Sequence, residues 1–138
     1  MTDRELLELA AKAAGIQYEW HPGCGDALHL TAPDATAIYW NPLSDDGDAL
    51  RLAVNLGIQI DPRNPETRVF GPVGERVDEY HKPDAFAATR RAIVRVAAEI
   101  GKVLKANEDC QRTRRGKRSN ARRQSERRSK QGNRGKKG

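Results

Sequence analysis

Apolar residues recur every three or four positions in three segments of the chain, which is the period of an α-helix. This pattern predicts helices over residues 3–14, about 45–56 and from about 84 to 106. The third helix begins at its cap, Asp84, and is expected to fray around residues 106–108. Its predicted buried stripe consists of Phe86, Ile93, Val96, Ala97, Ile100, Val103 and Leu104.

The first two helices carry capping signals at their ends. Thr2 followed by Glu5 three residues later matches a capping box, in which each side chain accepts a hydrogen bond from the other residue's backbone N–H. Gly15 and Gly57 each follow a helix and can end it in a left-handed conformation. The second helix is predicted to be buried over most of its circumference through Leu50, Leu52, Ala53, Val54 and Leu56.

Alternation of apolar and polar residues predicts short antiparallel strands between the helices. The predicted strands are residues 16–20, 28–31, 36–40 and 58–60. A further hairpin can join residues 68–70 to 76–80, although the four prolines between residues 62 and 83 favour an edge position or a loop. The predicted fold class is therefore α+β, a single small domain of three helices with a short antiparallel sheet.

The charge of the chain is divided between two regions. Residues 112–138 hold 13 Lys and Arg residues against one acid, a net charge of +12, whereas the residues before them have a net charge of −6. The basic region contains no aromatic residue and no Val, Ile, Leu or Met, so burial cannot offset the entropy of ordering it. We therefore predict an acidic globular domain over residues 1–106 and a disordered Arg/Lys-rich tail over residues 107–138.

Three aspartates, Asp45, Asp46 and Asp48, surround Gly47 just before the second helix. A calcium loop of the EF-hand kind needs a different order of acids and a glutamate at its end. A general acid–base pair needs a cleft and a reaction partner that the sequence does not supply. We interpret the aspartates as the start of the helix, with Ser44 or Asp45 as the cap, and Gly47 as a turn with positive φ just before it.

His21, Cys24 and His29 are the candidate metal ligands, with Asp26 or Cys110 as a fourth. Their spacing is not usual for zinc, and no second ligand pair accompanies them. A reactive cysteine needs positive surroundings, which this region lacks. We predict no metal site, no cofactor and no catalytic residue, so the protein is not expected to be an enzyme.

Two stretches resemble a family of small uncharacterised proteins of bacteriophages and prophages. They are WNPLSDDGDALRLAVNLGIQI, from Trp40 to Ile60, and ATRRAIVRVAAEIG, from Ala88 to Gly101. The resemblance implies an accessory phage role in the cytoplasm of a bacterial host and implies no catalysis. Two cysteines without a secretory signal also favour a reduced cytoplasm, and no apolar run reaches the length of about 18 residues that predicts a membrane span.

The basic tail is the candidate nucleic-acid-binding region, since dense positive charge attracts phosphates. It has no aromatic residue for base stacking, which leaves phosphate contact and shape. Ser119 or Asn120 can cap a helix over residues 121–131 that folds on binding. The predicted contact residues are Arg112, Arg114, Arg115, Lys117, Arg118, Arg122, Arg123, Arg127, Arg128, Lys130 and Arg134.

The stretch NARRQSERRSK within the tail resembles the arginine-rich RNA-binding peptides of lambdoid phage antiterminators. The matching positions are Asn120, Ala121, Arg122, Glu126, Arg127, Arg128 and Lys130. The leading hypothesis is a non-enzymatic phage-type accessory protein whose tail contacts DNA or RNA with low specificity. The alternative is a protein-binding factor whose acidic domain engages a host or defence protein, the tail being incidental. No membrane partner is expected.

Overall fold

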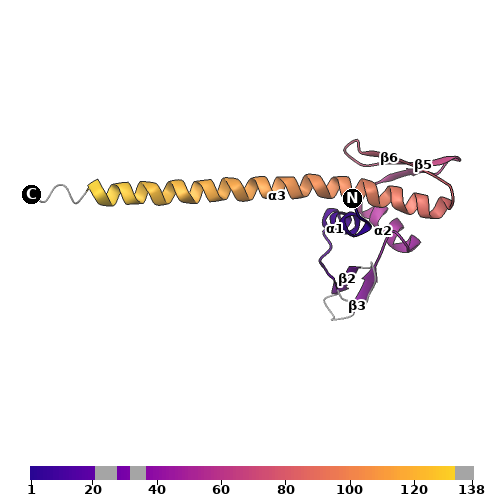
Figure 1. Cartoon of the computed structure of the whole chain (residues 1–138). Helices are drawn as coiled ribbons and strands as arrows, with labels where there is room; N and C mark the ends of the chain where they lie inside the picture. Colours follow the sequence, from indigo (N-terminus) through magenta and orange to yellow (C-terminus); the bar gives the residue numbers. More distant parts are fainter. Residues whose placement is uncertain (21–27, 32–36, 133–138) are drawn as a thin grey trace, which may run out of the picture. The chain divides into compact units, whose positions relative to one another are not determined.

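A computed structural model of the chain describes residues 1–20, 28–31 and 37–132 (Figure 1). The described residues include three helices, α1 (Asp3–Ala13), α2 (Asp46–Leu56) and α3 (Ala85–Gly132). Together with two small antiparallel sheets they confirm the α+β fold class. The chain divides into two compact units, Met1–Leu104, called the body below, and Lys105–Gly138, called the basic segment.

Each sheet has three strands in sequence order. The first contains β1 (Tyr18–Glu19), β2 (Leu28–Thr31) and β3 (Ala37–Trp40), as the alternation predicts. The second contains β4 (Gln59–Asp61), β5 (Glu66–Phe70) and β6 (Arg76–Tyr80), with Val69 paired to Val77. The hairpin predicted within residues 68–80 is therefore present. Its first strand lies at the centre of the sheet rather than at an edge, because every proline of the region falls outside the strands.

The predicted caps of the first two helices are confirmed. The Thr2 hydroxyl accepts a hydrogen bond from the Glu5 N–H at 3.2 Å, and the Thr2 N–H donates to the Glu5 carboxylate at 2.7 Å. The hydrogen bond that the Glu5 carboxylate accepts from the Thr2 N–H lowers the pKa of Glu5. Gly15 and Gly57 have φ of 69° and 66°, the left-handed conformation that ends a helix with little strain only in glycine.

The core lies on the first part of α3, with β5 and β6 on one side of that helix and α1 on the opposite side (Figure 1). Leu7, Val69, Val94 and Val96 are fully buried there. Trp40 joins the same core from the end of β3. Much of the buried surface of α3 is small, since it includes Ala88, Ala92, Ala97, Ala98 and Gly101.

Two predictions of burial are wrong. Helix α2 buries only one stripe, Ala49, Leu52 and Ala53, while Leu50 is 60% exposed and Val54 75% exposed. In α3, three residues of the predicted buried stripe are exposed: Phe86 at 71%, Val103 at 57% and Leu104 at 39%. Helical spacing identifies apolar positions but does not identify which of them face another element, because that depends on tertiary packing.

The basic segment differs from its predicted disorder, because α3 continues through it to Gly132. The helix passes through residues 106–108, where fraying was expected, and Ser119 and Asn120 lie within it rather than capping it. Composition explains the helix, since the segment has no proline and is rich in Arg, Lys, Gln and Glu, which have high helix propensity. An i,i+4 pair of Arg122 with Glu126 adds to it.

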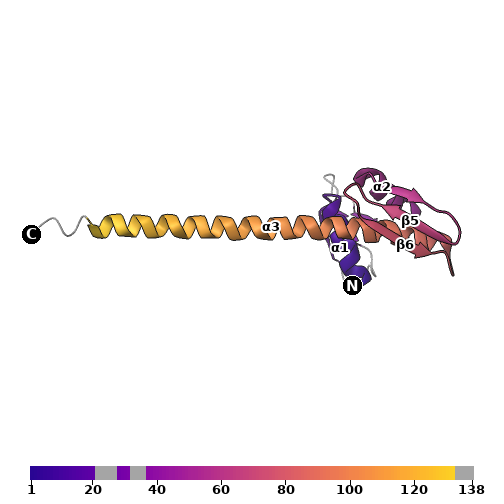
Figure 2. The same ribbon diagram turned by 90° about the horizontal axis from the view of Figure 1, so that it is seen from above.

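Helix α1 crosses α3 (Figure 2), and Gly101 of α3 faces the backbone of Leu9 of α1. A Cβ atom added to Gly101 would lie 2.0 Å from the backbone oxygen of Leu9. No side chain fits at this distance, and the obstacle is backbone rather than a side chain that can move. The crossing therefore requires glycine.

Replacing Gly101 with alanine is expected to lower the free energy of unfolding by about 1–3 kcal/mol, as overpacking does. Gly116 is the matched control, because it lies in the same helix with no atom near its added Cβ. Gly116→Ala should instead raise the helical circular dichroism signal, in line with a gain of about 1 kcal/mol in helix propensity. Urea unfolding of both variants checks this, and equal stability of the two would contradict the close crossing.

Candidate functional site

The predicted nucleic-acid-binding residues belong to the basic segment, which has 14 basic and three acidic residues and a net charge of +11. Seven of them lie in α3 with exposed side chains: Arg112, Arg114, Arg115, Lys117, Arg118, Arg122 and Arg123. Arg127, Arg128 and Lys130 also lie in α3, and Arg134 lies outside the described residues. At 100° per residue, the exposed side chains point around most of the helix circumference.

Helical periodicity gives the basic segment a defined spacing of charges. Residues 105–132 span about 42 Å at 1.5 Å per residue. Arg115, Arg118 and Arg122 follow one another at i, i+3 and i+7 and so share one side of the helix. Arg112 and Arg123, eleven residues apart, share another side. The segment thus presents several rows of cations rather than one binding face.

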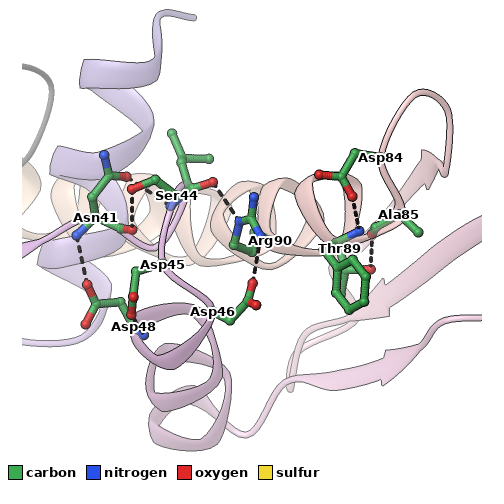
Figure 3. A network of polar contacts seen from close by, with 11 residues as sticks. Asn41, Ser44, Asp45, Asp46, Asp48, Asp84, Ala85, Thr89 and Arg90 are labelled. Atoms are coloured by element: carbon green, nitrogen blue, oxygen red, sulfur yellow. Dashed lines mark hydrogen bonds and ion pairs between the residues drawn. The ribbon is translucent and has the colours of Figure 1, made fainter.

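Asp45 and Asp48 accept hydrogen bonds from backbone N–H groups at the start of α2 (Figure 3). Asp45 is the cap, and its carboxylate accepts the Asp48 N–H at 2.8 Å. The Asp48 carboxylate accepts the Asn41 N–H at 3.0 Å. The helix-start interpretation is confirmed at Asp45, but the predicted positive φ of Gly47 is wrong, because Gly47 lies within the first turn of α2. An added Cβ there would lie 3.1 Å from the Asp45 carboxylate, so glycine leaves room for the cap.

Arg90 ties this corner to α3 (Figure 3). Its Nε donates to the Leu43 carbonyl at 2.9 Å, and its Nη1 donates to the Asp46 carboxylate at 2.6 Å. The Arg90 side chain is only 17% exposed, so these contacts keep a largely buried cation paired. The acidic corner is thus occupied by structural partners. Arg90 could not be identified as one of them from the sequence, because it lies 44 residues after Asp46.

A shallow apolar groove of about 410 Å³ lies between α2, β4 and the start of α3. It was not predicted from the sequence. Its lining consists of Asp46, Leu50, Ile60, Pro62, His81, Ala85, Phe86, Thr89, Arg90 and Ile93. Pockets of this size with mostly apolar walls and a few polar groups are typical binding sites.

A hydrogen-bond chain beside the groove fixes the tautomer of His81. The Thr89 hydroxyl donates its one proton to the Ala85 carbonyl at 2.8 Å, so it must accept from the Thr67 hydroxyl, also at 2.8 Å. The Thr67 proton is then used, so its oxygen must accept from His81 Nε2 at 2.8 Å. His81 therefore carries a proton on Nε2.

No group of three His, Cys, Asp or Glu residues is placed to hold a metal ion within the part of the chain that the structure describes. Of the candidate ligands, His21 and Cys24 lie outside that part. His29 lies in β2, paired with Glu19 and Tyr39 of the neighbouring strands. Among the described residues, no helix is long and apolar enough to cross a membrane.

Comparisons with known proteins return no matching family model, no similar curated protein and no similar solved structure.

Asp45→Ala should lower the free energy of unfolding by about 1 kcal/mol, because it removes the acceptor for the Asp48 N–H. Asp45→Asn keeps an acceptor and should remain near wild-type stability. Thermal unfolding with and without calcium checks this. A calcium-dependent stabilisation of the wild type that both variants abolish would show that the aspartates form an ion site instead.

The His81 imidazole should show the Nε2-protonated tautomer at neutral pH in a long-range ¹H–¹⁵N NMR spectrum. Thr67→Val removes the acceptor for that proton and should reduce the tautomer preference. It should also destabilise the fold by about 1–3 kcal/mol, because Thr67 is fully buried and the Thr89 oxygen loses its donor. A predominant Nδ1-protonated form in the wild type would contradict the hydrogen-bond direction.

Proposed function

We propose that this protein binds nucleic acid through the basic segment, as a non-enzymatic accessory protein of bacteriophage or prophage type. The proposal rests on one observation: exposed arginine and lysine side chains form several rows along a continuous helix. The resemblance of Trp40–Ile60 and Ala88–Gly101 to phage proteins supports the setting, which would be the cytoplasm of a bacterial host.

Charge supports phosphate contact as the source of affinity. The basic segment has a net charge of +11, and each phosphate that it neutralises releases condensed counterions. The body, with 11 basic and 16 acidic residues, has a net charge of −5 and is repelled by nucleic acid. Nucleic-acid binding is therefore assigned to the basic segment. This segment has no aromatic side chain that could stack on bases, so its affinity would come from phosphate contacts.

Helical order supports binding in a groove. A helix with its side chains is about 10–12 Å across, and the major groove of B-form DNA is about 12 Å wide. A preformed helix also loses less conformational entropy on binding than a disordered tail would. Cationic side chains surround the helix, so no single row of them is set apart for contacts to base edges. Because base-edge contacts provide sequence recognition, this supports low sequence specificity.

Replacing Arg115, Arg118 and Arg122 with glutamine in the full chain should weaken binding to both labelled duplex DNA and structured RNA. On duplex DNA, the slope of log K against log salt should fall by roughly 2.7, since each lost phosphate contact contributes about 0.9. Glutamine keeps helix propensity, so the change is in charge. Fluorescence anisotropy across a salt series measures both quantities.

The control is a triple replacement in the body, Arg4, Arg68 and Arg76 to glutamine, whose side chains are 61%, 51% and 54% exposed and do not line the groove. It removes the same charge and should leave the salt slope unchanged. Equal losses in the two triple variants would show that net charge alone matters. No binding by the wild type at physiological salt would refute the proposed function.

A further inference from the structure

The outer edge of α2 and the start of α3 together expose large apolar side chains. Leu50 and Val54 are one helical turn apart on α2 and are 60% and 75% exposed. Phe86, on α3, is 71% exposed and lines the same groove as Leu50. Single exposed apolar residues are ordinary, but a contiguous group beside a groove marks an interaction surface.

The groove side of this surface is a hollow with apolar walls. Ile60, Pro62 and Ile93 line it together with Leu50 and Phe86. Ile93 is 3% exposed and belongs to the core, so the groove reaches the core of the body. One surface therefore carries both protruding apolar side chains and a depression that can receive such side chains.

The charges at the rim of the groove are paired within the chain. Asp46 binds Arg90 at 2.6 Å, and Asp61, next to Pro62, binds Arg63 at 2.9 Å. Asp48 lies 3.5 Å from Arg51 on the exposed side of α2. The rim is thus locally neutral even though the body has a net charge of −5.

We propose that this surface, formed by Leu50, Val54, Phe86 and the groove, is the interface of a homodimer. A two-fold interface uses the same patch on both chains, so the patch must contain both a protrusion and a depression into which that protrusion fits. This patch does so, with exposed Leu50 and Phe86 beside the groove.

Charge favours a second copy over a basic protein partner. Because the charged residues at the groove rim form ion pairs, they do not repel the same surface of a second copy. They also leave no row of unpaired acids that would attract a basic protein segment. Homodimer interfaces are also more apolar than the remaining protein surface, as this patch is. The basic segment of the chain cannot fill the groove, since residues 105–138 contain no Val, Ile, Leu, Met or aromatic residue. The inference does not depend on the proposed function.

Sedimentation velocity of the full-length, nuclease-treated protein tests the dimer. At about 1 M salt the screening length is about 3 Å, so repulsion between basic segments is suppressed. The wild type should sediment at twice the chain mass of 15.3 kDa at micromolar concentration. Leu50→Glu and Phe86→Glu should each raise the dimer dissociation constant at least tenfold, and the double variant should be monomeric.

Val73→Glu is the matched control, because Val73 is 84% exposed in the turn between β5 and β6 and is not among the residues that line the groove. It should dimerise like the wild type. Phe86→Leu keeps an apolar side chain and should also dimerise, which separates loss of the interface from misfolding. A monomeric wild type at all concentrations overturns the proposal and leaves the surface to a different protein. An equal effect of Val73→Glu and Leu50→Glu overturns it as well.

Discussion

Helix α1 crosses α3 where Gly101 meets the backbone of Leu9, and the packing of the body follows from this short distance. Two helices can approach so closely only if the residues between them are small, and α3 presents Ala97, Ala98 and Gly101 within one turn of the crossing. Larger core side chains are supplied from outside the crossing, by Leu7 on α1 and Val69 on β5. A body of this size can bury only a modest core. The absence of a Cβ atom at Gly101 therefore affects how several elements pack, because protein cores are close-packed.

Helix α3 is stabilised by different forces along its length. Its first part buries Val94 and Val96 between the other elements of the body. From Lys102 to Arg118 the residues are classed as exposed, so this part gains little from burial and depends mainly on propensity and on charge pairs. Neighbouring cations also repel one another within the helix, and phosphates would relieve that repulsion. Under the proposed function, phosphate binding and helicity of the basic segment would therefore reinforce each other.

Local interactions were predictable from the sequence, and long-range ones were not. The capping box of Thr2 and the ends at Gly15 and Gly57 depend on residues a few positions apart, so the pattern identifies them. Disorder of the basic segment was inferred from its lack of apolar residues, an argument that omits helix propensity. The exposure of Leu50 could not be predicted, because it depends on which elements pack against α2. The groove escaped prediction for the same reason, since its walls come from three separate segments.

The body and the basic segment use charge in opposite ways, and this bears on how they would act together. Ion pairs such as Asp46 with Arg90 neutralise the rim of the groove, so the proposed homodimer would depend on apolar contact. The basic segment keeps an excess of eleven positive charges, which the proposed function assigns to phosphate contact. A homodimer would carry two such segments on one particle, so that after one segment binds, the second binds the same nucleic acid at a raised effective concentration. Two segments that each bind weakly and without sequence specificity would then give the dimer a higher overall affinity for nucleic acid than one segment has.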